Sequence, residues 1–330
     1  MKKLLITALL SLFVFGCEKE PTRVDVGITT FWGEAAFYVA DSEGFFQQEG
    51  LKVITHEHSA GKKSLKKLYE EKIDIAHVAE FPVAEALSGT QKYVEDSDIN
   101  LKIFSEMIYT SNSQKVIARY DHGIKTAQDL KNKKVGIYQG TTSEYFLDTF
   151  LLEHGINEQT IEVVNVEIPN HQKALKNGKI DAVVSWEPYA SEILSTLGDE
   201  VHQLNSVLGH STLWMATSSA RYIQKHPDII VKYLQALKKA EDYIQTHPKQ
   251  GQKLIAQKTN TSRETIRKLW DSIEYELSIS QRMLSLLQDQ RRWLRAEKFI
   301  DDTTELTDIN KALYFQALKK VNPKGLTVIR

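Results

Sequence analysis

Short runs of alternating hydrophobic and polar residues recur along the first part of the chain, and segments with helical spacing separate them. Val24, Val26 and Ile28 alternate with polar residues, which predicts a first strand that ends near Gly33. The elements predicted here are a strand at 24–28, a helix at 34–46, a strand at 51–55, a helix at 62–71, a strand at 73–78 and a helix that ends at Leu87. Such alternation is typical of an α/β fold with a parallel sheet.

The same alternation recurs in the middle of the chain. It predicts strands at 135–138, 161–166 and 180–185 and helices at 143–153 and 170–177. Predicted strands at 101–109 and 115–119 lead into this second set, and a predicted strand at 210–218 leads back to the first. We therefore predict two α/β lobes, with residues 23–112 and 210–330 in lobe 1 and residues 113–209 in lobe 2. A cleft between two lobes is a usual place for a small ligand.

Beyond residue 218 the pattern predicts only helices. Their expected ranges are 219–225, 227–246, 249–259, 263–269, 286–299 and 309–321. Apolar residues at spacings of three and four beside charged residues are typical of helices that pack on one face. We expect this helical C-terminal region to pack on lobe 1, and it contains no catalytic signature.

The first residues have the pattern of a secretory leader. Lys2 and Lys3 precede an apolar run of about twelve residues, which is shorter than the roughly twenty residues of a membrane-spanning helix. Cys17 directly follows Gly16 at the end of this run and resembles the modified cysteine of a bacterial lipoprotein box. We predict a signal peptide at 1–16, which is cut off on export, and a lipidated tether at 17–22, which anchors the protein to a membrane in the periplasm. Glu18 is compatible with sorting to the outer membrane, and the bulk of Phe15 leaves an incidental cysteine as the alternative.

Composition excludes several classes of function. The 42 Lys and Arg residues nearly balance the 43 Asp and Glu residues, and the net charge of −1 gives no basic surface for nucleic acid. Cys17 is the single cysteine, so its lipidation would leave no thiol for disulfides, catalysis or a metal site. A chain of 330 residues is long enough for two lobes with substantial cores.

The turn at Gly140, Thr141, Thr142 and Ser143 follows a predicted strand and opens a predicted helix. Free N–H groups and the helix dipole favour an anion at such a position, and the three hydroxyl groups add donors. An oxyanion or a carboxylate could therefore bind here. The alternative is ordinary N-capping of the helix by one of these hydroxyl groups.

Other candidate binding residues follow strand ends or lie where the chain passes between lobes. Trp186 could stack on a ligand, and Glu187 could accept a hydrogen bond from its amine or ring N–H. Glu80 likewise favours a ligand with a positive or N–H-bearing group. The remaining candidates are Thr30, Trp32, Phe81 and Ser113. The alternatives are packing between the lobes for the aromatic residues and stabilisation of helix N-termini for the two carboxylates.

Metal and catalytic motifs are lacking from the sequence. His56 and His58 could place two imidazoles on one side of an extended segment, but no third ligand is indicated and a solvated loop is the simpler interpretation. No G-x-S-x-G, phosphate-binding loop or H-E-x-x-H sequence occurs. We therefore expect no enzyme, no cofactor and no metal.

Several segments together resemble the extracytoplasmic solute-binding proteins of bacterial ABC importers, of the nitrate, sulfonate and taurine type that includes pyrimidine-precursor binders. They are GFFQQEGLKV, EKIDIAHV, TAQDLKNKKVGI, GTTSEYFLD and GKIDAVVSWEPY, within residues 24–245. The resemblance implies a type II periplasmic-binding-protein fold, a ligand trapped on closure of the lobes, and docking on the membrane subunits of a permease.

The expected function is therefore capture of a small polar solute by a monomeric, membrane-anchored receptor. The helix N-terminus favours an anionic group on the ligand, whereas the two carboxylates favour a cationic or N–H-bearing group. A sulfonate, a taurine-like zwitterion or an N-heterocycle is therefore the expected solute. Two alternatives remain at this point. One is a sensor that reports to a membrane signalling protein, and the other is an enzyme on the same fold, of the menaquinone-pathway lyase or pyrimidine synthase type.

Overall fold

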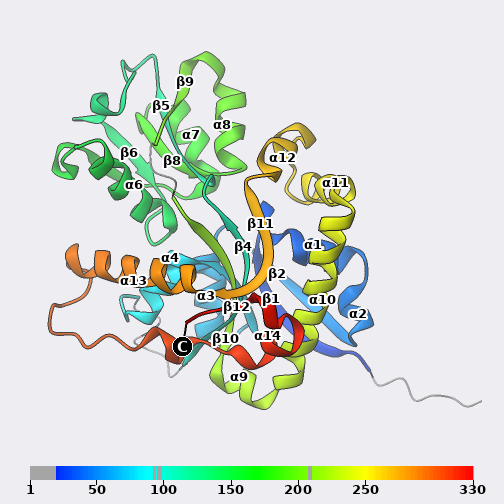
Figure 1. The fold of residues 1–330 in the computed structure, drawn as a ribbon. Coiled ribbons are helices and arrows are strands. Elements are labelled where there is room, and N and C mark those ends of the chain that lie inside the picture. Colours follow the sequence, from blue (N-terminus) through cyan, green and yellow to red (C-terminus); the bar gives the residue numbers. More distant parts are fainter. Residues whose placement is uncertain (1–19, 92–93, 95–98, 207–209, 330) are drawn as a thin grey trace, which may run out of the picture.

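The computed structural model describes residues 20–91, 94, 99–206 and 210–329. Its chain forms two sheets, one of seven strands and one of five, each covered by helices (Figure 1). We call the part built on the seven-stranded sheet lobe 1 and the part built on the five-stranded sheet lobe 2. The predicted leader with Cys17 and Glu18 lies outside the described residues.

Lobe 1 contains a mixed sheet whose strand order is β12-β11-β4-β10-β3-β1-β2. The strands are β1 (Thr22–Thr29), β2 (Leu51–His58), β3 (Ile75–Ala79), β4 (Leu101–Thr110), β10 (Thr212–Ser219), β11 (Ile273–Ser280) and β12 (Leu326–Thr327). Strand β1 pairs in parallel with β2 and β3, whereas β10 runs antiparallel to β3 and β4. The alternating residues Val24, Val26 and Ile28 are buried, as the predicted first strand requires.

Helices of lobe 1 come from both ends of the chain. They are α1 (Ala35–Ser42), α2 (Phe45–Gln48), α3 (Gly61–Tyr69), α4 (Glu80–Leu87), α9 (Ala220–Lys225), α10 (Pro227–Thr246), α11 (Pro248–Lys258), α12 (Arg263–Trp270), α13 (Gln281–Ala296) and α14 (Phe315–Val321). The predicted helix at 34–46 is divided, because Gly44 has a left-handed φ of 70° between α1 and α2. Short 3-10 helices lie at η1 (Trp32–Glu34), η6 (Ile309–Ala312) and η7 (Pro323–Gly325).

Lobe 2 contains a five-stranded sheet in the order β7-β6-β8-β5-β9. Its strands are β5 (Gln114–Arg119), β6 (Lys134–Ile137), β7 (Glu162–Asn165), β8 (Ala182–Trp186) and β9 (Val201–Leu204). Its helices are α6 (Thr142–Glu153), α7 (His171–Lys176) and α8 (Tyr189–Leu197), with 3-10 helices η2 (Ala127–Leu130), η3 (Glu158–Thr160), η4 (Ile168–Asn170) and η5 (Gly198–Glu200). Two separate apolar clusters pack around this sheet.

The lobes are in direct contact. Lys63 of α3 forms an ion pair with Glu167 of lobe 2 at 3.1 Å, and Trp186 of lobe 2 belongs to the main apolar cluster of lobe 1. The chain crosses from one lobe to the other twice, once between β4 and β5 and once between β9 and β10. The structure therefore shows the two lobes closed on each other.

The predicted uninterrupted run of helices after residue 218 is wrong, because this region also contains strands. Strand β11 lies between α12 and α13 and pairs with β4 at the far side of the lobe 1 sheet. Its residues Ile273, Tyr275, Leu277 and Ile279 alternate with polar ones, which is a strand period. Strands β9 and β12 were likewise not predicted, and both are short.

The C-terminal helices pack on lobe 1 as expected, and α13 also reaches lobe 2 (orange in Figure 1). Trp293 of α13 donates a hydrogen bond from Nε1 to Asp148 Oδ2 of α6 at 2.7 Å. Its ring also contacts Phe81 and Tyr145, which belong to different lobes. Helix α13 therefore lies along the boundary between the lobes.

Candidate functional site

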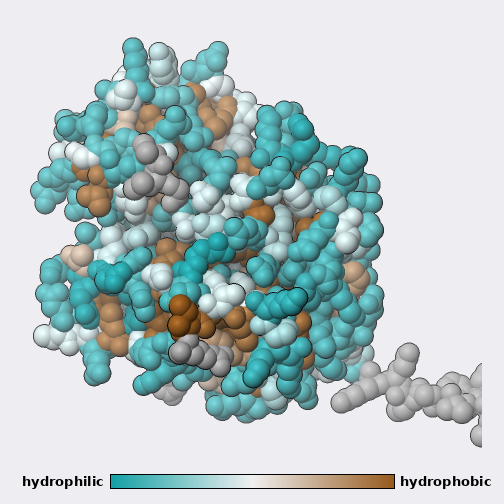
Figure 2. Space-filling model, viewed as in Figure 1, coloured by the Kyte–Doolittle hydropathy of each residue, from teal (hydrophilic) through white to brown (hydrophobic). Residues whose placement is uncertain are grey.

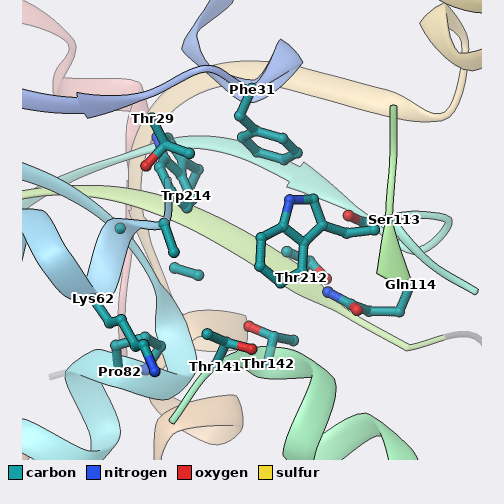
Figure 3. Close-up of a pocket in the computed structure, with 14 residues that line it drawn as sticks. Thr29, Phe31, Lys62, Pro82, Ser113, Gln114, Thr141, Thr142, Thr212 and Trp214 are labelled. Atoms are coloured by element: carbon teal, nitrogen blue, oxygen red, sulfur yellow. The ribbon is translucent and has the colours of Figure 1, made fainter. Parts of the chain in front are cut away.

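A cavity lies where the two lobes and both chain crossings meet, and it contains about 420 Å³ of empty space. This figure includes space open to solvent, and the volume that water-sized groups can occupy is about 40 Å³, which is enough for a few such groups when the lobes are in contact. The residues that line this cavity are Thr29, Phe31, Ala60, Gly61, Lys62, Ala79, Pro82, Ser113, Gln114, Thr141, Thr142, Trp186, Thr212 and Trp214. Figure 3 shows Thr141 and Thr142 of lobe 2 on one side, Phe31 and Trp214 of lobe 1 on the other, Ser113 at the right and Thr212 near the centre of the view.

Four polar atoms of this lining are buried without a hydrogen-bond partner in the described part of the chain. They are Thr29 Oγ1, Ser113 Oγ, Gln114 Oε1 and Thr212 Oγ1. Because buried polar groups in folded proteins are nearly always hydrogen-bonded, these four atoms require a ligand or ordered water in the cavity. The hydroxyl groups can donate or accept, whereas the Gln114 oxygen accepts only.

Three helices begin at the cavity wall. Ala60, Ala79 and Thr141 are the N-cap residues of α3, α4 and α6, they all line the cavity, and none makes a side-chain capping hydrogen bond. Gly61 permits the close approach of α3 to the sheet, because a Cβ atom there would lie 2.8 Å from the Val78 Cα atom. Uncapped N–H groups and helix dipoles that converge on one space give it a positive potential.

Lys62 adds the one charged side chain among the lining residues. Its ammonium group donates a hydrogen bond to the backbone oxygen of Gln139 and lies 3.7 Å from the centroid of the Tyr138 ring. Burial lowers the pKa of Lys62 because it disfavours the charged form, and nearby carboxylates oppose this effect. With a lysine and three helix N-termini and no carboxylate among the described lining residues, the cavity favours an anion.

Aromatic side chains form the apolar walls. The rings of Phe31 and Trp214 have centroids 5.0 Å apart. Trp214 donates from Nε1 to Glu34 Oε1 at 2.9 Å, and Glu34 Oε2 lies 2.6 Å from Nδ1 of the fully buried His77. Tyr233 OH completes this network at 2.8 Å from His77 Nε2. The indole of Trp214 is therefore held in place from behind and presents a fixed wall to the cavity.

Four of the predicted binding residues line the cavity. They are Ser113, Thr141, Thr142 and Trp186. The Thr141 hydroxyl donates to the Tyr138 backbone oxygen at 2.6 Å, and the Thr142 hydroxyl donates to Glu80 Oε1 at 2.8 Å. These two contacts hold the first turn of α6 against the cavity.

Glu80 lies behind the cavity lining and has no exposed surface. Besides Thr142 it accepts hydrogen bonds from the Leu213 backbone N–H at 2.9 Å and from Gln290 Nε2 at 3.3 Å. Burial raises the pKa of Glu80 to about 7, against the opposing effect of these hydrogen bonds. Its carboxyl group is therefore engaged with protein donors from lobe 2, from β10 and from α13.

Glu187 and Trp32 contact each other across the lobes. Trp32 Nε1 donates to the Glu187 backbone oxygen at 2.6 Å, and the Glu187 carboxylate accepts from the Ser191 backbone N–H at 3.0 Å. Burial raises the pKa of Glu187. Both residues lie outside the set that lines the cavity.

The remaining predicted residues also lie outside the lining set. Ser143 is fully buried with its hydroxyl 2.8 Å from that of Thr141, and Phe81 stacks on Tyr145 with ring centroids 6.1 Å apart. Gly140 has a φ of 69° and donates its N–H to Glu144 Oε2 at 2.7 Å. Thr30 is half-buried at the end of β1.

Ten lining residues were absent from the predicted binding set: Thr29, Phe31, Ala60, Gly61, Lys62, Ala79, Pro82, Gln114, Thr212 and Trp214. Several directly adjoin predicted residues, such as Phe31 beside Trp32 and Gln114 beside Ser113. Ala60 and Gly61 follow the second strand at the start of a helix, which is the same signal that selected Gly140 to Ser143. Trp214 lies within a strand, and no local signal separates it from a core residue.

Neither a metal cluster nor a membrane span occurs in the described part of the chain. No group of three or more His, Cys, Asp or Glu side chains there could hold a metal ion. His56 Nε2 pairs with Asp25 Oδ1 at 2.7 Å, and His58 Nδ1 lies 3.1 Å from Ser64 Oγ. Among the same residues, no helix has the length and apolar character needed to cross a bilayer.

Comparison with known proteins places the chain in a family. The model of the NMT1/THI5-like family matches residues 33–251. A putative aliphatic sulfonates-binding protein of Bacillus subtilis is 23% identical, with 94% of each chain covered, and the taurine-binding periplasmic protein of Escherichia coli is 22% identical, with 72% of each covered.

Solved structures share the fold. The alkanesulfonate-binding protein SsuA of Xanthomonas axonopodis pv. citri, bound to MOPS, has a TM-score of 0.73 at 18% identity and covers 90% of this chain and 99% of its own. The desulfurization enzyme DSZB has a TM-score of 0.69 at 14% identity and covers 92% and 99%. These similarities confirm the predicted two-lobed fold of type II periplasmic binding proteins, and the extent of the family match shows that the chain belongs to the NMT1/THI5-like family.

Proposed function

We propose that the protein is the extracytoplasmic solute-binding component of an ABC transporter and captures a small organic anion between its lobes. The observation that carries this proposal is the convergence of four unpartnered buried polar atoms on one cavity at the lobe boundary. A binding protein that closes around its ligand requires such groups, since they lose water on closure and regain partners from the ligand.

The lining chemistry supports a sulfonate or carboxylate head group. Lys62 and the N-termini of α3, α4 and α6 favour negative charge, and the aromatic walls suit an apolar or flat ligand body. The expected role of Glu80 and Glu187 in holding an amine has no geometric support, because both carboxyl groups bind protein donors. The Gln114 oxygen offers one acceptor for an N–H or O–H group on the ligand.

The lobe boundaries that we propose remain 23–112 with 210–330 and 113–209. Support comes from the sheets: β4 ends at Thr110 in lobe 1, β5 begins at Gln114 in lobe 2, and β10 begins at Thr212 in lobe 1. Opening would rotate the lobes about these two crossings and break the contacts of Trp32 with Glu187 and of Glu80 with Thr142.

We further propose an exported monomer that a lipid on Cys17 anchors in the periplasm and that docks on a membrane permease. The leader pattern and the E. coli relative that is a periplasmic protein support export. The face in Figure 2 is largely hydrophilic, with hydrophobic residues in small separate groups, which is typical of a soluble monomer surface.

Binding rather than catalysis is the activity that the cavity supports. None of the described lining residues is His, Cys, Asp or Glu. The Thr142 hydroxyl donates to Glu80, but this carboxyl group also accepts from the Leu213 N–H and from Gln290, so its contacts join the lobes and do not single out one hydroxyl as a nucleophile. The resemblance of the fold to DSZB concerns the fold alone.

A thermal-shift assay tests the proposal. Aliphatic sulfonates, taurine, nitrate, pyrimidines and short carboxylates are added singly to the processed protein, and an organic anion is expected to raise the midpoint of unfolding by mass action. Thr212→Val should abolish most of the shift, whereas Thr196→Val on the exposed face of α8 should leave it intact. No shift with any anion in this set would refute the proposed solute class.

A further inference from the structure

A second hollow lies along α13, apart from the inter-lobe cavity, and contains about 500 Å³ of empty space. The two spaces share no lining residue. The described residues around the second hollow are Gln288, Arg291, Arg292, Arg295 and Leu306. All of them lie beyond residue 251, where the match to the family model ends.

Two of the three arginines in this hollow have a buried N–H group that has no partner among the described residues. Arg291 is only 5% exposed, and while its Nε donates to Ser88 Oγ at 3.3 Å, its buried Nη2 has no hydrogen-bond partner. Arg295 donates from Nη2 to the Thr304 backbone oxygen at 2.5 Å, but its buried Nε has no partner. The third, Arg292, is exposed and pairs with Asp289.

The charge in the hollow is uncompensated at short range. Among the described residues, neither Arg291 nor Arg295 forms an ion pair, and the two cations repel each other. Asp308 attracts Arg291 from a greater distance, but its carboxylate accepts hydrogen bonds from Asn310. Burial of an unpaired cation is strongly unfavourable, so a folded protein keeps such an arrangement where an anion completes it.

We propose that this hollow is a second binding site, which holds a phosphate-type oxyanion against the guanidinium groups of Arg291 and Arg295. Guanidinium groups present N–H donors in a fixed planar arrangement that matches the oxygens of phosphate, and such charge-assisted hydrogen bonds are the stronger kind in proteins. The phosphate group can belong to a free ion, to a soluble phosphate ester or to a lipid head group. This site does not depend on the solute of the inter-lobe cavity.

Titration of the processed protein in a calorimeter, with inorganic phosphate and separately with glycerol 3-phosphate, tests the first two sources. The double variant Arg291→Gln with Arg295→Gln should bind phosphate roughly ten- to a hundredfold more weakly, because two charge-assisted hydrogen bonds are lost. Arg292→Gln is the matched control, since its guanidinium is exposed and already paired. Trp186→Ala, which alters the inter-lobe cavity, should leave this binding unchanged and so separates the two sites.

Vesicles of phosphatidylglycerol, compared with vesicles of phosphatidylcholine, test the lipid source. If the wild type binds phosphatidylglycerol vesicles and the double variant does not, a lipid head group is supported as the ligand, even when free phosphate does not bind. The melting curve of the double variant checks its fold, and Arg295→Gln alone, at a half-buried position, replaces it if the double variant does not fold. Equal binding by the wild type and the arginine variants in both arms, or no binding in either, would overturn the proposal.

Discussion

Glu80 offers a quantitative test of how the lobes are joined. Its carboxyl group has no exposed surface and accepts hydrogen bonds from Thr142 of lobe 2, from the Leu213 N–H of β10 and from Gln290 of α13. Burial raises its pKa from 4.5 to about 7. We predict that Glu80→Gln removes a pH dependence of stability that the wild-type protein shows.

The direction of this pH dependence follows from the pKa values of Glu80 in the folded and the unfolded chain. Because the folded pKa of Glu80 lies above the unfolded value, the native chain holds its proton more tightly between about pH 4.5 and about pH 7. Its stabilising contribution is fully present below the unfolded pKa and is lost as the pH rises through the folded pKa. Since a tenfold change in proton affinity is worth about 1.4 kcal/mol, the contribution is about 3 kcal/mol.

Urea unfolding of both proteins across this pH range measures the effect. The free energy of unfolding of the wild type, minus that of Glu80→Gln, should fall by about 3 kcal/mol from about pH 4.5 to about pH 8. Glu85, whose pKa burial raises to about 8, titrates in both proteins and cancels in the difference. A difference that stays constant with pH would refute the assignment of a buried, proton-binding carboxyl group at the lobe boundary.

Other substitutions test separate parts of the structure. Trp186→Ala should weaken solute binding roughly tenfold or more in calorimetry because a buried aromatic wall is lost, and unchanged affinity would move the site elsewhere. Trp32→Phe should lower the free energy of unfolding by about 1–3 kcal/mol, since the buried Glu187 backbone oxygen loses its partner at 2.6 Å, and an unaltered urea midpoint would contradict this contact. Cys17→Ser should shift the protein from the membrane fraction to the soluble fraction, and retention on the membrane would refute the lipid anchor.

Much of the fold could be predicted because local patterns repeat regularly in both lobes. Strands such as β1 and β8 have period-two or continuous apolar patterns, and each is followed by a helix. Strand β11 was missed although Ile273, Tyr275, Leu277 and Ile279 alternate with polar residues, because predicted helices stand on both sides of it and its pairing with the distant β4 cannot be seen in the sequence. Pairing of this kind depends on tertiary structure, which a local pattern does not report.

The candidate site was only partly predictable for a related reason. Thr141, Thr142 and Trp186 line the cavity because helix starts and strand ends do gather at one edge of a sheet. The position of a residue directly after a strand does not, however, determine the direction of its side chain. Glu187 bends back to the N–H of Ser191 in its own helix, which is the N-terminal stabilisation that the sequence allowed as its alternative. Gln114 and Trp214 enter the site from segments that only the assembled lobes bring together.

Native mass spectrometry of the protein purified gently from its host tests the central claim most directly. The structure predicts one small organic anion bound to each wild-type molecule, since four buried polar atoms of the cavity lack partners among the described residues and its lining is electropositive. The same ligand should be missing from Thr212→Val and Trp186→Ala. A cationic ligand, or an anion that both variants retain in full, would contradict capture in the cavity between the lobes.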